Sequence, residues 1–195
     1  MITGILLAAG SSSRMGTPKQ LLPWRGEPLV RHAARQALAS GLEGLVVVLG
    51  HEAAAVAAAL DGLPVQCVRN AEYATGQASS LRAGLAALPG EAEAAVVLLC
   101  DQPLVTPALI DAIAASYRGA PGVVAVIPRF EGQRGNPVLL ARPLFTELMT
   151  LEGDEGARRV LQRHGERVRW LDVGDAAAVT DVDTLEAYES VKRKA

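Results

Sequence analysis

The sequence predicts an α/β fold in which one doubly wound, mostly parallel sheet carries helices on both faces. Short, fully apolar segments rich in β-branched residues alternate along the chain with alanine-rich helical segments. These apolar segments lack the alternating polarity of a half-exposed sheet, so we expect both faces of the sheet to be covered. Alternation of strands and helices favours parallel pairing through crossover connections. With 195 residues, 50% of them hydrophobic, the chain suits one domain over residues 1–195.

The elements are expected in the following order. Strands are expected at 5–7, 45–49, 65–68, 95–99, 123–127 and 137–140. Helices are expected between them at 28–40, 52–60, 79–88 and 107–117, several of them closed by a glycine. Beyond Asn136 the rhythm is less regular, with helices at 143–149 and 156–164, a strand at 168–171 and a last helix at about 183–192.

Bulk properties limit the partners and the compartment. The 19 Lys and Arg residues are balanced by 21 Asp and Glu residues, so no overall positive field is available to hold a nucleic-acid backbone. No apolar run reaches the roughly 20 residues of a membrane-spanning helix, and the apolar start lacks the basic residues of a signal peptide. Cys67 and Cys100 end apolar runs, which predicts buried free thiols in a reducing compartment. We therefore expect a soluble, cytoplasmic protein with neither a nucleic-acid nor a membrane partner.

The loop after the first expected strand has the composition of a phosphate cradle. Residues 7–19 read LAAGSSSRMGTPK. Gly10 and the serines allow backbone N–H groups to approach anionic oxygens, Arg14 can contact two oxygens at once, and Lys19 supplies a mobile charge. The loop matches neither the GxGxxG nor the GxxxxGK[ST] motif. A structural turn with surface cations is the alternative.

Asp101 stands where the strand at 95–99 reaches the carboxyl edge of the sheet, which is where doubly wound folds bind their ligands. Magnesium prefers oxygen ligands and typically takes one or two carboxylates, so Asp101 is a candidate metal ligand. The alternative is that Asp101 caps the following helix or its turn.

Asp181 and Asp183 form a second acidic group just before the last expected helix. Either of them could complete a metal site with Asp101, and Asp183 is slightly favoured. The competing interpretation is a helix start, because Asp183 or Thr184 is well placed as an N-cap.

Three further loops carry small polar or charged residues. The segment 75–84 places Gly76, Ser79 and Ser80 near a helix start, where hydroxyl and N–H groups suit a ribose or a base edge, although a serine N-cap is the simpler interpretation. The segments 132–137 and 153–158 are polar loops bracketed by glycines. Their arginines are either ligand-binding groups or surface cations.

The loop at 7–19 resembles the LAAGxSxRMGxxK signature of the molybdenum cofactor cytidylyltransferases, which are nucleotidyltransferases. The later segments GQRGNPV and GDEGAR are similar to the GxRGNPV and GDxGAR motifs of the same family, so the resemblance extends over essentially the whole chain. It implies a Rossmann-like nucleotidyltransferase fold.

The resemblance also implies roles for individual residues. Arg14, Lys19 and Asp101 would be catalytic, and Mg²⁺ would be held by Asp101 with Asp183 or Asp181. The implied nucleotide-binding residues are Leu7, Ala8, Ala9, Gly10, Ser11, Ser12, Arg14, Lys19, Gly76, Ser79 and Ser80. The implied residues of the pterin-side pocket are Arg134, Asn136, Asp154 and Arg158.

The activity that the resemblance implies is transfer of CMP from CTP to the terminal phosphate of a molybdopterin-type cofactor, with release of pyrophosphate. The partners would be CTP, the cofactor, and a molybdoenzyme or its chaperone that receives the product. An attacking phosphate is already largely ionised at neutral pH because its second pKa is about 6, so no Ser-His-Asp triad is needed.

Three alternatives remain open at this point. Related guanylyltransferases use GTP and resemble this chain, but carry Gly where Ala9 stands. A sugar-phosphate or isoprenoid-type nucleotidyltransferase and a noncatalytic nucleotide-binding module could share the same fold.

Overall fold

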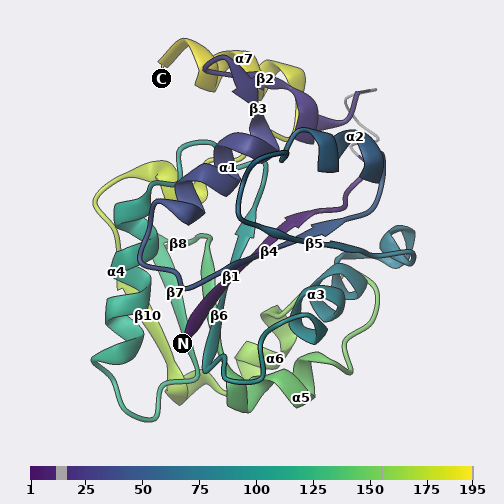
Figure 1. The fold of residues 1–195 in the computed structure, drawn as a ribbon. Helices are drawn as coiled ribbons and strands as arrows, with labels where there is room; N and C mark the ends of the chain where they lie inside the picture. The colour runs from purple at the N-terminus through teal and green to yellow at the C-terminus, as the bar shows by residue number, and fades with distance from the viewer. Residues whose placement is uncertain (12–16, 155, 195) are drawn as a thin grey trace.

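The computed structural model describes residues 1–11, 17–154 and 156–194. Within these residues an eight-stranded sheet forms the centre of the molecule, with the order β10-β7-β9-β6-β1-β4-β5 and with β8 paired to β7 (Figure 1). The strands are β1 (Ile2–Ala8), β4 (Leu45–Leu49), β5 (Gln66–Arg69), β6 (Ala94–Leu99), β7 (Ala125–Phe130), β8 (Gln133–Arg134), β9 (Val138–Ala141) and β10 (Val168–Asp172). Only β8 and β9 run antiparallel to their described neighbours, which confirms the predicted mostly parallel sheet.

The strand order reverses at β1. From β1 the chain continues outward through β4 and β5, and it then returns to place β6 on the other side of β1. Leu7 pairs in register with Val48 of β4 and with Leu99 of β6. The loops that follow β1 and β6 therefore leave the sheet side by side, at the position where doubly wound sheets open a ligand crevice.

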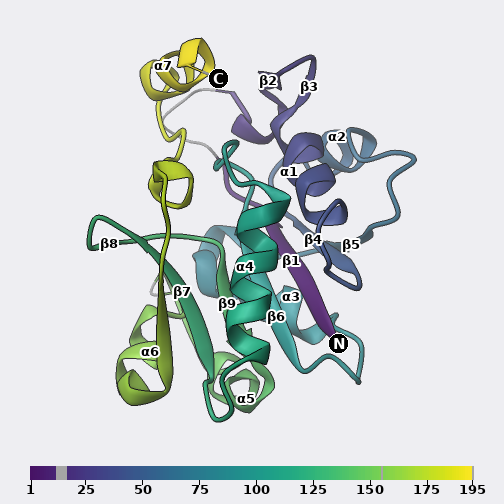
Figure 2. The same cartoon turned by 90° about the vertical axis from the view of Figure 1, so that its left-hand side faces the viewer.

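Helices cover both faces of the sheet. Helices α1 (Leu29–Leu38), α2 (Ala53–Ala58) and α4 (Pro107–Arg118) share one buried apolar cluster with the sheet, whereas α3 (Gln77–Ala86), α5 (Phe145–Leu148) and α6 (Arg158–Arg163) share another. Figures 1 and 2 show α4 and α3 on opposite sides of the sheet.

The sequence explains how these helices attach. In α1, Val30, Ala33, Ala34 and Ala37 recur at helical spacing and are all buried, so they form one apolar stripe against the sheet. On the other face Gly84 lets α3 approach β1 closely, because a Cβ at this position would stand 2.5 Å from Cγ2 of Ile5.

The C-terminal helix α7 (Leu185–Lys194) packs beside a small hairpin of β2 (Pro23–Trp24) and β3 (Glu27–Pro28), at the top of Figures 1 and 2. Trp24 and Tyr188 are buried together there, with their ring centroids 6.5 Å apart. The Tyr188 hydroxyl also donates a hydrogen bond to the carbonyl of Pro23. This packing brings the end of the chain to the carboxyl edge of the sheet.

Several local expectations need correction. Cys67 is exposed, because β5 is the edge strand and directs most of its side chains to solvent. The expected helix at 143–149 is divided into a 3-10 turn at Arg142–Leu144 and a short α-helix, α5, at Phe145–Leu148. None of the described helices is long and apolar enough to cross a membrane.

Candidate functional site

A cavity of about 440 Å³ opens at the carboxyl ends of β1 and β6. Many of its lining residues are ones that the sequence singles out. These are Leu7, Ala9, Gly10, Ser11, Lys19, Gly76, Ser80, Asp101 and Asp154. The cavity lies at the reversal of strand order, so the fold supplies the crevice that the sequence analysis expects there.

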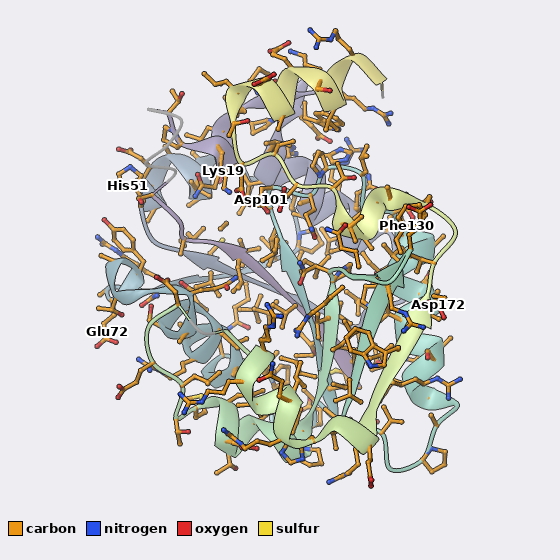
Figure 3. All side chains as sticks on the ribbon, turned by 180° about the vertical axis from the view of Figure 1, so that it is seen from behind. Lys19, His51, Glu72, Asp101, Phe130 and Asp172 are labelled. Carbon is orange, nitrogen blue, oxygen red and sulfur yellow. The ribbon has the colours of Figure 1, made fainter. Side chains whose placement is uncertain are left out.

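Lys19 joins two carboxylates at the edge of this cavity. Its ammonium group donates to Oδ2 of Asp101 and, at 2.9 Å, to Oδ1 of Asp183. Figure 3 shows Lys19 and Asp101 side by side above the sheet. Burial alone would lower the pKa of Lys19, but Asp101 and then Asp183 outweigh it and hold the pKa above its usual value. Lys19 is therefore a cation at physiological pH.

The backbone explains why Asp183 meets Lys19. The N–H of Val182 donates to the carbonyl of Asp101 at 2.9 Å, so the segment before α7 docks against the loop after β6. Thr184 caps α7, because its Oγ1 accepts from the N–H of Ala187 at 3.1 Å. Asp183 is thus not needed as the cap and directs its carboxylate to Lys19.

Asp101 is not a helix cap either. The N-cap of α4 is Thr106, whose Oγ1 accepts from the N–H of Leu109 at 3.3 Å. Among the described residues, Oδ1 of Asp101 is buried and has no hydrogen-bond partner. A buried carboxylate oxygen without a partner is costly, so it suits a site completed by a ligand.

The carboxylates fit a hard divalent cation bound together with a substrate. The described residues contain no group of three or more His, Cys, Asp or Glu that could hold a metal by themselves. Asp101 and Asp183 nevertheless converge on one cation, the ammonium of Lys19. Magnesium often takes one or two carboxylates and fills its shell with phosphate oxygens and water, so two carboxylates are sufficient. Asp181 does not join this ion pair, and burial, then Asp183 and Asp101, raise its pKa.

The loop after β1 is held by a residue that the sequence analysis missed. Gln20 is buried, and its Nε2 donates to the carbonyls of Ala8 at 3.2 Å and Gly10 at 2.6 Å. Ser12 and Arg14, two of the predicted phosphate-binding residues, lie outside the described residues.

The start of α3 depends on a close backbone contact. Gly76 has a φ of 118°, and a Cβ at this position would stand 2.3 Å from the carbonyl carbon of Gly153. Two N–H groups at the start of the helix donate to the same loop: Ala78 to the carbonyl of Gly153 at 3.0 Å, and Gln77 to Oδ1 of Asp154 at 3.1 Å. Asp154, expected in the pterin-side pocket, therefore lines the first cavity beside the predicted nucleotide-binding residues.

A buried asparagine supports the two serines of α3. Asn70 follows β5 directly, and its Nδ2 donates to Oγ of Ser79 and Ser80. Ser80 lines the first cavity, whereas Ser79 turns inward and bonds to backbone carbonyls. The rule that selects Asp101, a polar residue just after a strand, would also have found Asn70.

A second cavity of about 270 Å³ lies next to the first, and the two share Leu7, Gln77 and Leu99 as lining residues. Arg134, Asn136 and Arg158 line the second cavity over an apolar floor. Burial lowers the pKa of Arg134, and the charge of Arg158 lowers it further. Two guanidinium groups that repel each other in a partly buried site favour an anionic ligand.

Sequence comparison agrees with this geometry. Residues 4–168 match the MobA-like NTP transferase domain. The chain belongs to the MobA-like NTP transferase family. It is thus a nucleotidyltransferase by family, and two similar proteins match it over nearly their whole lengths. A protein from Paenarthrobacter nicotinovorans named nicotine blue oxidoreductase is 36% identical, with 95% of this chain and 93% of the relative covered. The purine catabolism protein PucB of Bacillus subtilis is 33% identical, with 98% and 96% covered.

Solved structures show the same fold for this transferase. The crystal structure of Rv0371c from Mycobacterium tuberculosis has a TM-score of 0.87 and 35% identity, with 98% of this chain and 97% of that chain covered. A complex of that protein with manganese has a TM-score of 0.85 and 32% identity, with coverage of 100% and 99%. A nucleotidyl transferase from Methanothermobacter has a TM-score of 0.86 and 25% identity, with coverage of 100% and 97%.

Proposed function

We propose that this transferase moves CMP from CTP to the terminal phosphate of a molybdopterin-type cofactor. The observation that carries the proposal is the pair of adjoining cavities. The first offers Lys19 and two carboxylates, and the second offers two guanidinium groups over an apolar floor. Their shared wall allows a nucleotide and a phosphorylated acceptor to meet.

In this proposal Asp101 and Asp183 hold Mg²⁺, which neutralises triphosphate oxygens when it is bound. The unpartnered Oδ1 of Asp101 among the described residues supports the assignment, as does the manganese complex of the similar Mycobacterium tuberculosis protein. Asp183 is preferred over Asp181 because only Asp183 reaches the ammonium of Lys19 in the described contacts.

The chain's own groups stabilise the leaving pyrophosphate. Lys19 places a permanent positive charge at the mouth of the first cavity, and Gly10 and Ser11 bring the backbone of the loop after β1 to the same wall. Arg14 would add a bidentate contact to the phosphates. Charge stabilisation of this kind needs no nucleophilic side chain.

Arg134 and Arg158 are proposed to hold the acceptor phosphate, and Asn136 to read the heteroatoms of the pterin. An oxygen of the acceptor phosphate attacks the α-phosphorus of CTP, the bond from that phosphorus to the bridging oxygen of the β-phosphate breaks, and pyrophosphate leaves. Since the acceptor is already ionised, positioning by the two arginines replaces a general base. A molybdoenzyme or its chaperone would then take up the product.

A pyrophosphate-release assay tests the proposal. Purified protein with Mg²⁺ and the molybdopterin-type cofactor is given CTP, GTP, ATP or UTP in turn, with reactions lacking the cofactor as controls. We expect release with CTP that depends on the cofactor. Preferred release with GTP would indicate a guanylyltransferase, and nucleotide binding without any release would indicate a noncatalytic binding module.

A further inference from the structure

The side chain of Asn70 has a fixed orientation. It is buried, and its Oδ1 accepts from the backbone N–H of Glu72 at 2.9 Å. A backbone N–H can only donate, so the amide oxygen must face Glu72 and the amide nitrogen must face the serines. Nδ2 lies 2.8 Å from Oγ of Ser79 and 3.1 Å from Oγ of Ser80. Both serine oxygens are therefore acceptors from Asn70.

Ser79 uses its own hydrogen inside the protein. Its Oγ lies 3.0 Å from the carbonyl of Glu72 and 2.8 Å from the carbonyl of Gly76. Either carbonyl accepts the Ser79 proton. The single donor hydrogen of this buried hydroxyl is thus used within the protein.

Ser80 differs, because none of the described residues accepts its hydrogen. Its oxygen already accepts from Asn70, and its side chain lines the first cavity. A hydroxyl has a single donor hydrogen, which leaves that hydrogen for a ligand in the cavity. The network therefore presents Ser80 to the cavity as a hydrogen-bond donor.

The surroundings of Ser80 suit a base. Leu7, Ala9 and Tyr73 line the cavity with Ser80, whereas the charged groups Lys19 and Asp101 come from the loops at the ends of β1 and β6. A hydroxyl donor on a wall that also carries the apolar side chains of Leu7 and Ala9 matches a carbonyl oxygen on a flat ring. Cytosine and uracil carry such an oxygen at position 2, where guanine carries an amino donor.

We propose that Asn70 is a positioning residue that makes Ser80 a hydrogen-bond donor to O2 of the pyrimidine base. The inference rests on the proposed use of CTP and adds a reason for pyrimidine preference. Asn70 acts only through Ser80 and does not line the cavity itself.

The test measures binding of CTP with Mg²⁺ by calorimetry, without the acceptor. Ser80→Ala should weaken binding by about 3- to 10-fold, the usual effect of one lost hydrogen bond. Asn70→Asp keeps the acceptor for Glu72 but makes both serines donate to the carboxylate, so Ser80 turns a lone pair toward the base. We expect a loss at least as large as that of Ser80→Ala.

The double variant separates positioning from added charge. In the Ser80→Ala background, Asn70→Asp should change CTP affinity by less than about twofold. An equal loss in both backgrounds would overturn the proposal. Ser116→Ala is the matched control, since Ser116 lies in α4 on the opposite face and its buried Oγ has no partner among the described residues. It should leave CTP affinity unchanged.

Modified nucleotides identify the acceptor atom even if Asn70→Asp fails to fold. The wild type should bind 2-thio-CTP more weakly than CTP because sulfur is a poorer acceptor, and Ser80→Ala should abolish this difference. If Ser80→Ala instead abolishes a difference between CTP and 2′-deoxy-CTP, the acceptor is the ribose and the proposal is wrong. A wild type that does not bind CTP would refute the proposed function itself.

Discussion

The ammonium of Lys19 lies 2.9 Å from the carboxylate of Asp183, although 164 positions separate them in the chain. The same ammonium contacts Asp101 at the end of β6. Three distant segments thus converge on one positive charge, with side-chain exposures of 17% for Lys19, 14% for Asp101 and 47% for Asp183. Removing that charge would leave two carboxylates facing each other in a partly buried position, where their repulsion would destabilise the fold.

Lys19→Met should destabilise the fold at neutral pH by about 1–3 kcal/mol, the scale of charged hydrogen bonds in a site that water still reaches. The sequence alone treats Lys19 as a mobile cation, whose loss would cost little. Thermal unfolding should show a lower Tm that Mg²⁺ or Mn²⁺ raises more in the variant than in the wild type. A variant with wild-type stability at pH 7 would contradict the ion-pair argument.

Asp101→Asn should keep the fold and lose most turnover, because an amide preserves the shape but not the charge that holds a divalent cation. We expect a loss of several tens-fold or more in kcat, which corresponds to roughly 2 kcal/mol or above. Circular dichroism checks the fold, and pyrophosphate release measures turnover. Turnover within about twofold of the wild type would remove Asp101 from the metal site.

Asp183→Asn and Asp181→Asn form a matched pair two positions apart. Asp183 pairs with Lys19, so its replacement should lower turnover and weaken binding of Mn²⁺. Asp181→Asn should affect turnover less and should raise stability at pH 7. The pKa of Asp181 is raised in the folded state, which disfavours its charged form, so the gain should diminish as pH falls and the wild-type carboxyl becomes protonated. The opposite ranking in turnover would transfer the metal role to Asp181.

Gly76→Ala should destabilise the protein by about 1–3 kcal/mol or more and weaken CTP binding, because the added Cβ would collide with backbone rather than with a flexible side chain. The positive φ of 118° adds further strain for any residue with a Cβ. Gly90→Ala is the control, since nothing lies within 4 Å of its Cβ position. Denaturant unfolding compares the two variants. Equal stability of the two variants would show that the backbone at Gly153 can move away from the added Cβ at little cost in free energy.

The alternation of strands and helices could be predicted because each element carries its own pattern of apolar residues. The hairpin of β2 and β3 could not, since each strand has two residues and no periodicity. In the structure its turn places Arg25 and Gly26 at positive φ, 48° and 86°, and of the two only the glycine is a residue type that favours such a turn. Trp170 is likewise not placed by any pattern in the sequence: it is 45% exposed on the edge strand β10, where Arg129 lies over its ring.

The site could be predicted as a set of residues but not as a set of contacts. Asp101 stood out because a lone carboxylate follows an apolar strand. Which of Asp181 and Asp183 meets Lys19 depends on where α7 docks. The docking position depends in turn on the packing of Tyr188 in α7 against Trp24, which lies far away in the sequence. Gln20 was missed because its role, holding the carbonyls of the loop after β1, appears only when the loop closes on itself.

Base choice should depend on Ala9. Ala9 lines the first cavity and is 3% exposed, and its carbonyl accepts from the N–H of His51 at 3.1 Å. Because this hydrogen bond holds the backbone in place, Ala9→Gly should change little besides removing one methyl group. Related guanylyltransferases resemble this chain but carry Gly at this position, so we expect the methyl group to narrow the space for a purine.

Wild-type enzyme should therefore prefer CTP to GTP, and Ala9→Gly should relax that preference without inverting it. A single methyl group in a pocket is typically worth about 1–3 kcal/mol, so the relaxation should be about 10- to 200-fold at most. Competition kinetics with both nucleotides measures the ratio of kcat/KM for each enzyme. Equal or better use of GTP by the wild type would overturn the cytidylyl assignment. Unchanged selectivity in the variant would show that Ala9 does not select the base. Base choice would then depend on Ser80 and the start of α3, and Ser80→Ala should lower the preference for CTP.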